Sequence, residues 1–75
     1  MKSVQVRLIN TDHVKHLVEI VEKVPYDVDM CSGRYVVDAK SILGIFSLDL
    51  SKPIRMDIYN DDCGELIQAL QPYIV

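Results

Sequence analysis

The spacing of the apolar residues changes repeatedly along this chain, between every second position and every third or fourth. Val4, Val6 and Leu8 recur at every second position, which predicts a strand with one buried face. The apolar residues that follow have helical spacing. They are Val14, Leu17, Val18, Val21 and Val24. Asn10-Thr11-Asp12 offers side-chain oxygens to the free amides of a first helical turn, and Pro25 cannot continue a helix.

The same pattern predicts the remaining elements. The expected elements are a strand over 26–31, a strand over 34–38, a short helix over 41–47, a strand over 54–59 and a last short helix that ends before residue 72. Ser32-Gly33 is a turn signal that makes the first two of these strands a hairpin. Asp62 and Glu65 resemble a capping box before the last helix. The order β-α-β-β-α-β-α predicts an α+β fold, with helices on one face of a four-stranded, mostly antiparallel sheet.

Length and composition limit the class of protein. With 75 residues, 49% hydrophobic and 25% charged, the chain is expected to fold as a single domain over residues 1–75. A net charge of −3 provides no basic surface for a nucleic acid. The longest apolar-rich stretch, 42–50, contains Ser47 and Asp49 and is far shorter than the ~20 residues of a membrane span. We therefore expect neither nucleic-acid nor membrane binding.

The amino terminus and the cysteines predict the compartment. Residues 1–7 alternate between apolar and polar and lack the apolar region of a signal peptide. Cys31 and Cys63 form neither a C-x-x-C pair nor a dense disulfide framework, so free thiols are expected. These features predict a cytoplasmic protein.

The middle of the chain carries a more specific signal. Residues 40–48 read K-S-I-L-G-I-F-S-L. This segment resembles the K-S-I-M-G-V-M-S-L segment of HPr, the histidine-containing phosphocarrier protein of the phosphoenolpyruvate-dependent sugar phosphotransferase system. The order of elements agrees with HPr over nearly the whole chain, although the last helix is shorter. The resemblance implies an HPr-like open-faced β-sandwich. It also implies a bacterial protein whose partners are proteins of the phosphotransferase or catabolite-regulation type.

The phosphohistidine motif of that family is altered here. In HPr a histidine lies in the motif G-[IL]-H-x-R-P at the start of the first helix, where helix amides and the arginine hold the phosphoryl group. Residues 9–16 of this chain read I-N-T-D-H-V-K-H, without that glycine, arginine or proline. Aligning the apolar helical stripe places Asn10 near the position of the phosphohistidine. Aligning the histidines instead makes His13 the phosphoacceptor and Lys15 the substitute for the arginine. We prefer the first alignment because it keeps the packing stripe in register.

His13 also has a simpler interpretation, as a surface histidine in the first turn of a helix. A phosphorylatable imidazole needs an exposed nitrogen, and the neighbouring carboxylate of Asp12 would repel an incoming phosphoryl group. His13 and His16 are three residues apart on the predicted helix, but the sequence indicates no third metal ligand. No metal and no cofactor is predicted.

Ser41 matches a regulatory position of the family. In HPr of Gram-positive bacteria the corresponding serine is phosphorylated by an ATP-dependent kinase, and the modified protein acts as a carbon-catabolite co-repressor. A paralogue used in catabolite repression keeps the serine and lacks the histidine. Phosphate at a helix start meets free amides and adds about −2 charge to a contact surface. The alternative is that Ser41 serves only as a helix cap.

The residues that follow Ser41 are unusually apolar. The predicted docking surface comprises Ile42, Leu43, Ile45, Phe46 and Ser47. A short amphipathic helix cannot bury four large apolar side chains on one side, and in the family this helix contacts partner proteins. The alternative is that only Leu43 is exposed and that the other apolar residues belong to the core.

Two functions remain. The first is a regulatory or protein-interaction module without a phosphohistidine, controlled by phosphorylation of Ser41. The second is a phosphocarrier that accepts a phosphoryl group on His13. Neither makes the chain an enzyme, since a carrier is the phosphorylated substrate of other enzymes. The altered histidine motif favours the first.

Overall fold

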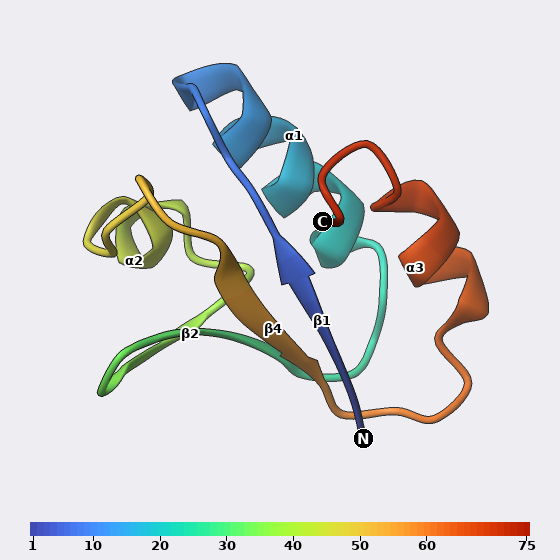
Figure 1. Cartoon of the computed structure of the whole chain (residues 1–75). Coiled ribbons are helices and arrows are strands. Elements are labelled where there is room, and N and C mark those ends of the chain that lie inside the picture. The colour runs from blue at the N-terminus through green and yellow to red at the C-terminus, as the bar shows by residue number, and fades with distance from the viewer.

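The computed structural model describes residues 1–75 and contains one four-stranded sheet and three helices (Figure 1). The elements are β1 (Lys2–Val6), α1 (Thr11–Glu22), β2 (Val28–Ser32), β3 (Tyr35–Asp38), α2 (Ile42–Phe46), β4 (Ile54–Ile58) and α3 (Gly64–Ala69). The strand order is β1-β4-β2-β3, and each neighbouring pair is antiparallel. The predicted order β-α-β-β-α-β-α and the open-faced sandwich are therefore confirmed.

The core lies between the sheet and the helices. Alternate residues of β4 and β2 point toward the helices and are fully buried, and Figure 1 shows α1 and α3 side by side there. From the strands these residues are Ile54, Met56, Ile58, Val28 and Met30. From α1 the buried residues are Val14, Leu17, Val18 and Val21, four of the five residues of the predicted apolar stripe. The fifth, Val24, follows the end of the helix and is half-buried. The cluster of buried apolar residues has 18 members, drawn from all three helices and from every strand except β3.

The hairpin between β2 and β3 turns one residue later than the sequence predicted. Ser32 pairs with Tyr35, so the two turn residues are Gly33 and Arg34. Gly33 has φ +60°, while no other residue has a positive φ. Glycine at the first central position is typical of a type II′ turn, whose twist matches that of the flanking strands.

The capping box predicted for α3 is wrong. The N-cap residue is Cys63, and its side chain makes no capping hydrogen bond. The reason is a tight turn before the helix, in which the Asp62 backbone N–H donates to Asn60 Oδ1 at 2.8 Å. That turn leaves Asp62 one position too early to cap α3.

The last residues return to the first strand. The Arg7 N–H donates to the Tyr73 carbonyl at 2.8 Å, and the Val75 N–H donates to the Gln5 carbonyl at 3.0 Å. Ile74 forms an isolated antiparallel bridge with Val6. These contacts cover part of the outer edge of β1.

The face of the sheet away from the helices holds a polar network around Asp57. This carboxylate is 7% exposed. It accepts hydrogen bonds from Ser3 Oγ at 2.7 Å, from Arg55 Nε at 3.1 Å and from Cys31 Sγ at 3.5 Å. The Ser3 hydroxyl, followed by the Cys31 thiol and the Arg55 guanidinium, lowers the pKa of Asp57 against the opposing effect of burial.

Both cysteines are free, as expected, and both are buried. Cys31 lies in β2 and Cys63 at the start of α3. Burial raises the pKa of the Cys31 thiol. None of the three helices combines the length and the apolar character that crossing a membrane requires.

Asp57→Asn is expected to destabilise the protein by about 1–3 kcal/mol at neutral pH, because the amide replaces a carboxylate that accepts hydrogen bonds from three side chains. The folded-state pKa of Asp57 is depressed, so its stabilisation is present above the unfolded value of about 3.9 and disappears as pH falls through the folded value. The difference in the free energy of unfolding between the original protein and the Asp57→Asn variant should therefore shrink below about pH 4.

Urea unfolding of both proteins at neutral and at acid pH measures this difference. Asp27→Asn is the matched control, since Asp27 is exposed. Equal stability of the Asp57→Asn variant and the original protein at neutral pH would contradict the interpretation of the network.

Candidate functional site

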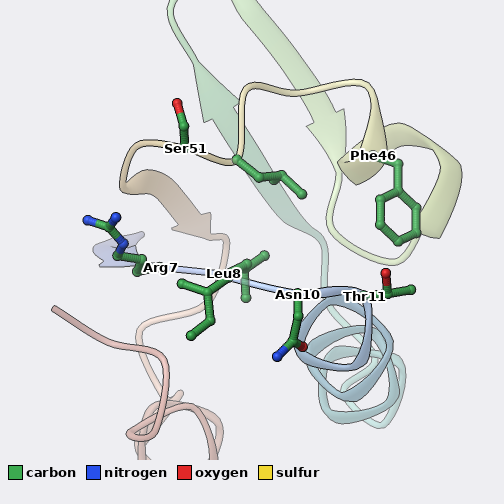
Figure 2. Close-up of a pocket in the computed structure, with 8 residues that line it drawn as sticks. Arg7, Leu8, Asn10, Thr11, Phe46 and Ser51 are labelled. Carbon is green, nitrogen blue, oxygen red and sulfur yellow. The ribbon is translucent and has the colours of Figure 1, made fainter.

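The β1–α1 segment, the end of α2 and the α2–β4 connection line an open surface cavity of about 510 Å³. It is lined by Arg7, Leu8, Ile9, Asn10, Thr11, Phe46, Leu50 and Ser51. Figure 2 shows Arg7 and Ser51 at one end of the cavity and Phe46 and Thr11 at the other. The helix start of α1 and the apolar side chain of Phe46 therefore share one surface depression.

Asn10 begins α1. Its backbone is extended, with φ −153° and ψ 173°, and its side-chain Oδ1 accepts a hydrogen bond from the His13 N–H at 2.8 Å. The cap satisfies one of the amides that a helix leaves free at its start. Asn10 is therefore the N-cap residue of α1.

His13 lies in the first turn of α1 and is half-buried. Its Nδ1 lies 3.5 Å from the Ile9 backbone N–H, and its ring packs edge-on against Tyr73 at a centroid distance of 5.2 Å. Tyr73 also hydrogen-bonds His16 Nδ1 through its hydroxyl. Lys15 is exposed. The ring of His13 is thus packed against the carboxy-terminal segment and does not line the cavity.

Ser41 lies exposed at the start of α2. Its Oγ accepts a hydrogen bond from the Gly44 N–H at 3.1 Å. A Cβ at Gly44 would lie 3.1 Å from Val37 Cβ and 3.2 Å from Ser41 Oγ, so any larger residue here would force one of these neighbours to shift by a few tenths of an ångström. The Lys40 ammonium donates to the Val24 carbonyl at 2.9 Å, which directs that charge toward the end of α1.

The residues of α2 divide into two sets. Leu43 is 80% exposed and Phe46 42% exposed, whereas Ile42 is half-buried. Ile45 is fully buried in the core, so its inclusion in the docking surface was wrong. The reason is geometric, because Ile45 is on the side of this short helix that faces the sheet. Ser47 is exposed and its hydroxyl donates to the Gly44 carbonyl at 2.6 Å.

Ile9 is a site residue that sequence reasoning missed. It is 70% exposed and lines the cavity together with Phe46. The alternation of residues 4–9 held the signal, since Ile9 follows the buried Leu8 at a position where an exposed side chain is expected.

The sequence matches no model of a protein family and no protein with a curated description. Solved structures give clear matches. HPr-C-His from Thermoanaerobacter tengcongensis is 28% identical with a TM-score of 0.78, over 96% of this chain and 89% of the other. The phosphocarrier protein HPr from Bacillus anthracis is 28% identical with a TM-score of 0.67, over 99% of this chain and 94% of the other. This chain is an HPr-like protein.

A third match supports the same fold. The histidine-containing phosphocarrier protein of Mycoplasma is 14% identical with a TM-score of 0.69, over 95% of this chain and 86% of the other. Sequence identities this low show how far the residues of an HPr-like chain can change while the order of elements stays the same.

Proposed function

We propose that this HPr-like chain is a regulatory protein-interaction module that carries no phosphohistidine and is controlled by phosphorylation of Ser41. It serves as a binding partner and kinase substrate of other proteins, and is not itself an enzyme. The observation that carries the proposal is the cap of α1, where Asn10 occupies the helix start. An asparagine amide is not a nucleophile for phosphoryl transfer, unlike an imidazole.

The surroundings of His13 support the absence of a phosphohistidine. Phosphoryl binding at a helix start uses free backbone amides, and the His13 amide already donates to Asn10. The carboxylate of Asp12 adds a negative charge to the first turn. The edge-on contact with Tyr73 restricts approach to the His13 ring.

Ser41 has the properties of a modification site. Its hydroxyl is exposed and already faces the Gly44 amide, so a phosphate on the same oxygen keeps an amide donor within reach. The added charge of about −2 would lie next to the exposed apolar side chains of α2. Phosphorylation would therefore change which partners this surface accepts.

The proposed docking surface consists of Ile9, Ile42, Leu43, Phe46 and Ser47. Ile9 and Phe46 line the cavity, and Ile42 and Leu43 are the first two residues of α2. Exposed apolar side chains gathered on one surface are typical of protein contact sites. The HPr proteins that resemble this chain suggest partners from the phosphotransferase system.

A second candidate function is phosphoryl transfer through His13, with Lys15 as the cation. It is favoured by the position of His13 in the first turn of α1 and by the exposure of Lys15. It requires the His13 ring to leave its contact with Tyr73.

Incubation with phosphoenolpyruvate and the cognate enzyme I is expected to add no phosphate to this chain, because the helix start carries Asn10. Intact-mass measurement reads the result, with an HPr protein in the same tube as the positive control. One acid-labile phosphate that is lost in His13→Ala would instead support the phosphocarrier function.

Incubation with ATP and the kinase that modifies HPr on serine is expected to add one acid-stable phosphate. Ser41→Ala should abolish the added mass. Ser47→Ala, a second exposed serine beside the same helix, is the matched control and should be modified like the original protein. Modification that persists in Ser41→Ala would place the regulated residue elsewhere.

Leu43→Asp is expected to weaken binding to that kinase about tenfold or more, as removal of a central contact residue does. The fold should be unaffected, since Leu43 is largely exposed. Biolayer interferometry measures the affinity, and Gln68→Asp on the exposed side of α3 is the control. Equal affinities for Leu43→Asp and the control would show that α2 does not contact the kinase.

A further inference from the structure

The two edges of the sheet differ. The outer edge of β1 is partly covered by the carboxy-terminal segment, through the hydrogen bonds of Tyr73 and Val75. The opposite edge is β3, and no further strand pairs with it. Natural proteins usually protect a free edge with lysine, proline or a bulge, because its unpaired backbone groups attract other strands.

β3 lacks these protections. Its sequence is Tyr-Val-Val-Asp, without lysine, proline or glycine. Tyr35 and Val36 are 69% and 61% exposed. β-Branched and aromatic residues favour strand pairing, so the edge is well suited to accept another strand.

The register of the hairpin shows which backbone groups face outward. Ser32 and Tyr35 flank a two-residue turn, which makes them a hydrogen-bonded pair. Pairs alternate along an antiparallel ladder, so Val36, opposite Cys31, directs its N–H and its carbonyl away from β2. By the same alternation the Asp38 N–H faces outward, while the Asp38 carbonyl accepts from the Ser41 N–H at 2.9 Å.

On the face of the sheet away from the helices, here called the open face, negative charges are in excess near β3. Asp38 lies opposite Asp29, and Asp29 lies opposite Asp57, so three carboxylates form one row across neighbouring strands. Arg55 forms a salt bridge with Asp57, and the Tyr59 hydroxyl donates to Asp29 at 3.0 Å. No cation of this chain forms a salt bridge with Asp38, and directly opposed like charges destabilise a sheet.

We propose that β3 pairs with β3 of a second copy of this chain, antiparallel and around a two-fold axis at Val36. In this register Val36 faces Val36 of the second copy, and the two exchange N–H to carbonyl hydrogen bonds. Arg34 then lies opposite Asp38 of the second copy, on the same side of the extended sheet. The two Arg34–Asp38 pairs give each Asp38 carboxylate a cationic partner, which it lacks within its own chain.

The two-fold axis also determines how the proposed dimer presents its surfaces. An antiparallel pair of edge strands keeps the same face of each sheet on the same side. The helices of both copies therefore lie on one side of a continuous eight-stranded sheet. The interface involves only a short strand from each copy, so the dimer is expected to be weak and reversible.

Sedimentation equilibrium from about 10 μM to about 1 mM tests the proposal over a range of weak to moderate affinities. The original chain should dimerise with increasing concentration, and less so at high salt. Arg34→Asp and Asp38→Arg should each weaken association about tenfold or more, because each opposes two like charges. The double variant that combines Arg34→Asp with Asp38→Arg should associate with nearly the original affinity. Lys52→Asp, on the exposed α2–β4 connection, is the control and should leave it unchanged.

Val36→Pro is a second test that does not depend on charge. Proline removes the outward N–H of Val36 and leaves the β2–β3 hydrogen bonds in place. This variant should remain folded by circular dichroism and should be monomeric. A chain that stays monomeric at the highest concentration would overturn the proposal. Dimerisation that neither the charge exchange nor Val36→Pro alters would overturn it as well, because the interface would lie elsewhere. Binding of an extended peptide to β3 by a strictly monomeric chain would assign the edge to a different partner.

Discussion

The packing of α1 against the sheet determines the arrangement of the rest of the molecule. Four apolar residues of this helix contact a sheet whose central strands contribute their own buried side chains. A shift of α1 by one residue would move the stripe by about 100° around the helix axis and expose part of it. The register of the helix is therefore fixed by the core, and so is the position of every residue at its start.

This constraint has a chemical consequence. The core places Asn10 at the helix start and His13 one turn later, against Tyr73. For His13 to occupy the helix start, the register of α1 against the sheet would have to shift by three residues. The buried apolar stripe does not permit this shift. Packing thus determines which residue of this chain lies at the start of α1. The chemistry available there is that of the asparagine side chain.

Local periodicity predicted the elements well, because each strand and helix has one face in the same core. It failed at turns and in the shortest helix, where too few residues repeat to show a period, and for the register between strands that lie far apart in the sequence. The turn at Asn60 displaced the cap of α3, and Gly33-Arg34 rather than Ser32-Gly33 formed the hairpin turn. Ile45 and Leu43 could not be distinguished, since a helix of five residues shows too little of its period. The row of carboxylates on the open face depends on strand register, which a single sequence does not show.

The residues that carry the proposed functions lie at the ends and edges of the elements. Asn10 and Ser41 begin α1 and α2, while Arg34 follows the turn glycine before β3. A domain of this size has a small core and limited stability, so most buried positions are needed for folding. Caps, turns and an edge strand can change with less effect on that core. Such a fold can consequently keep its packing while the residue at one helix start changes, and an exposed cap residue such as Ser41 can be kept or replaced independently of it.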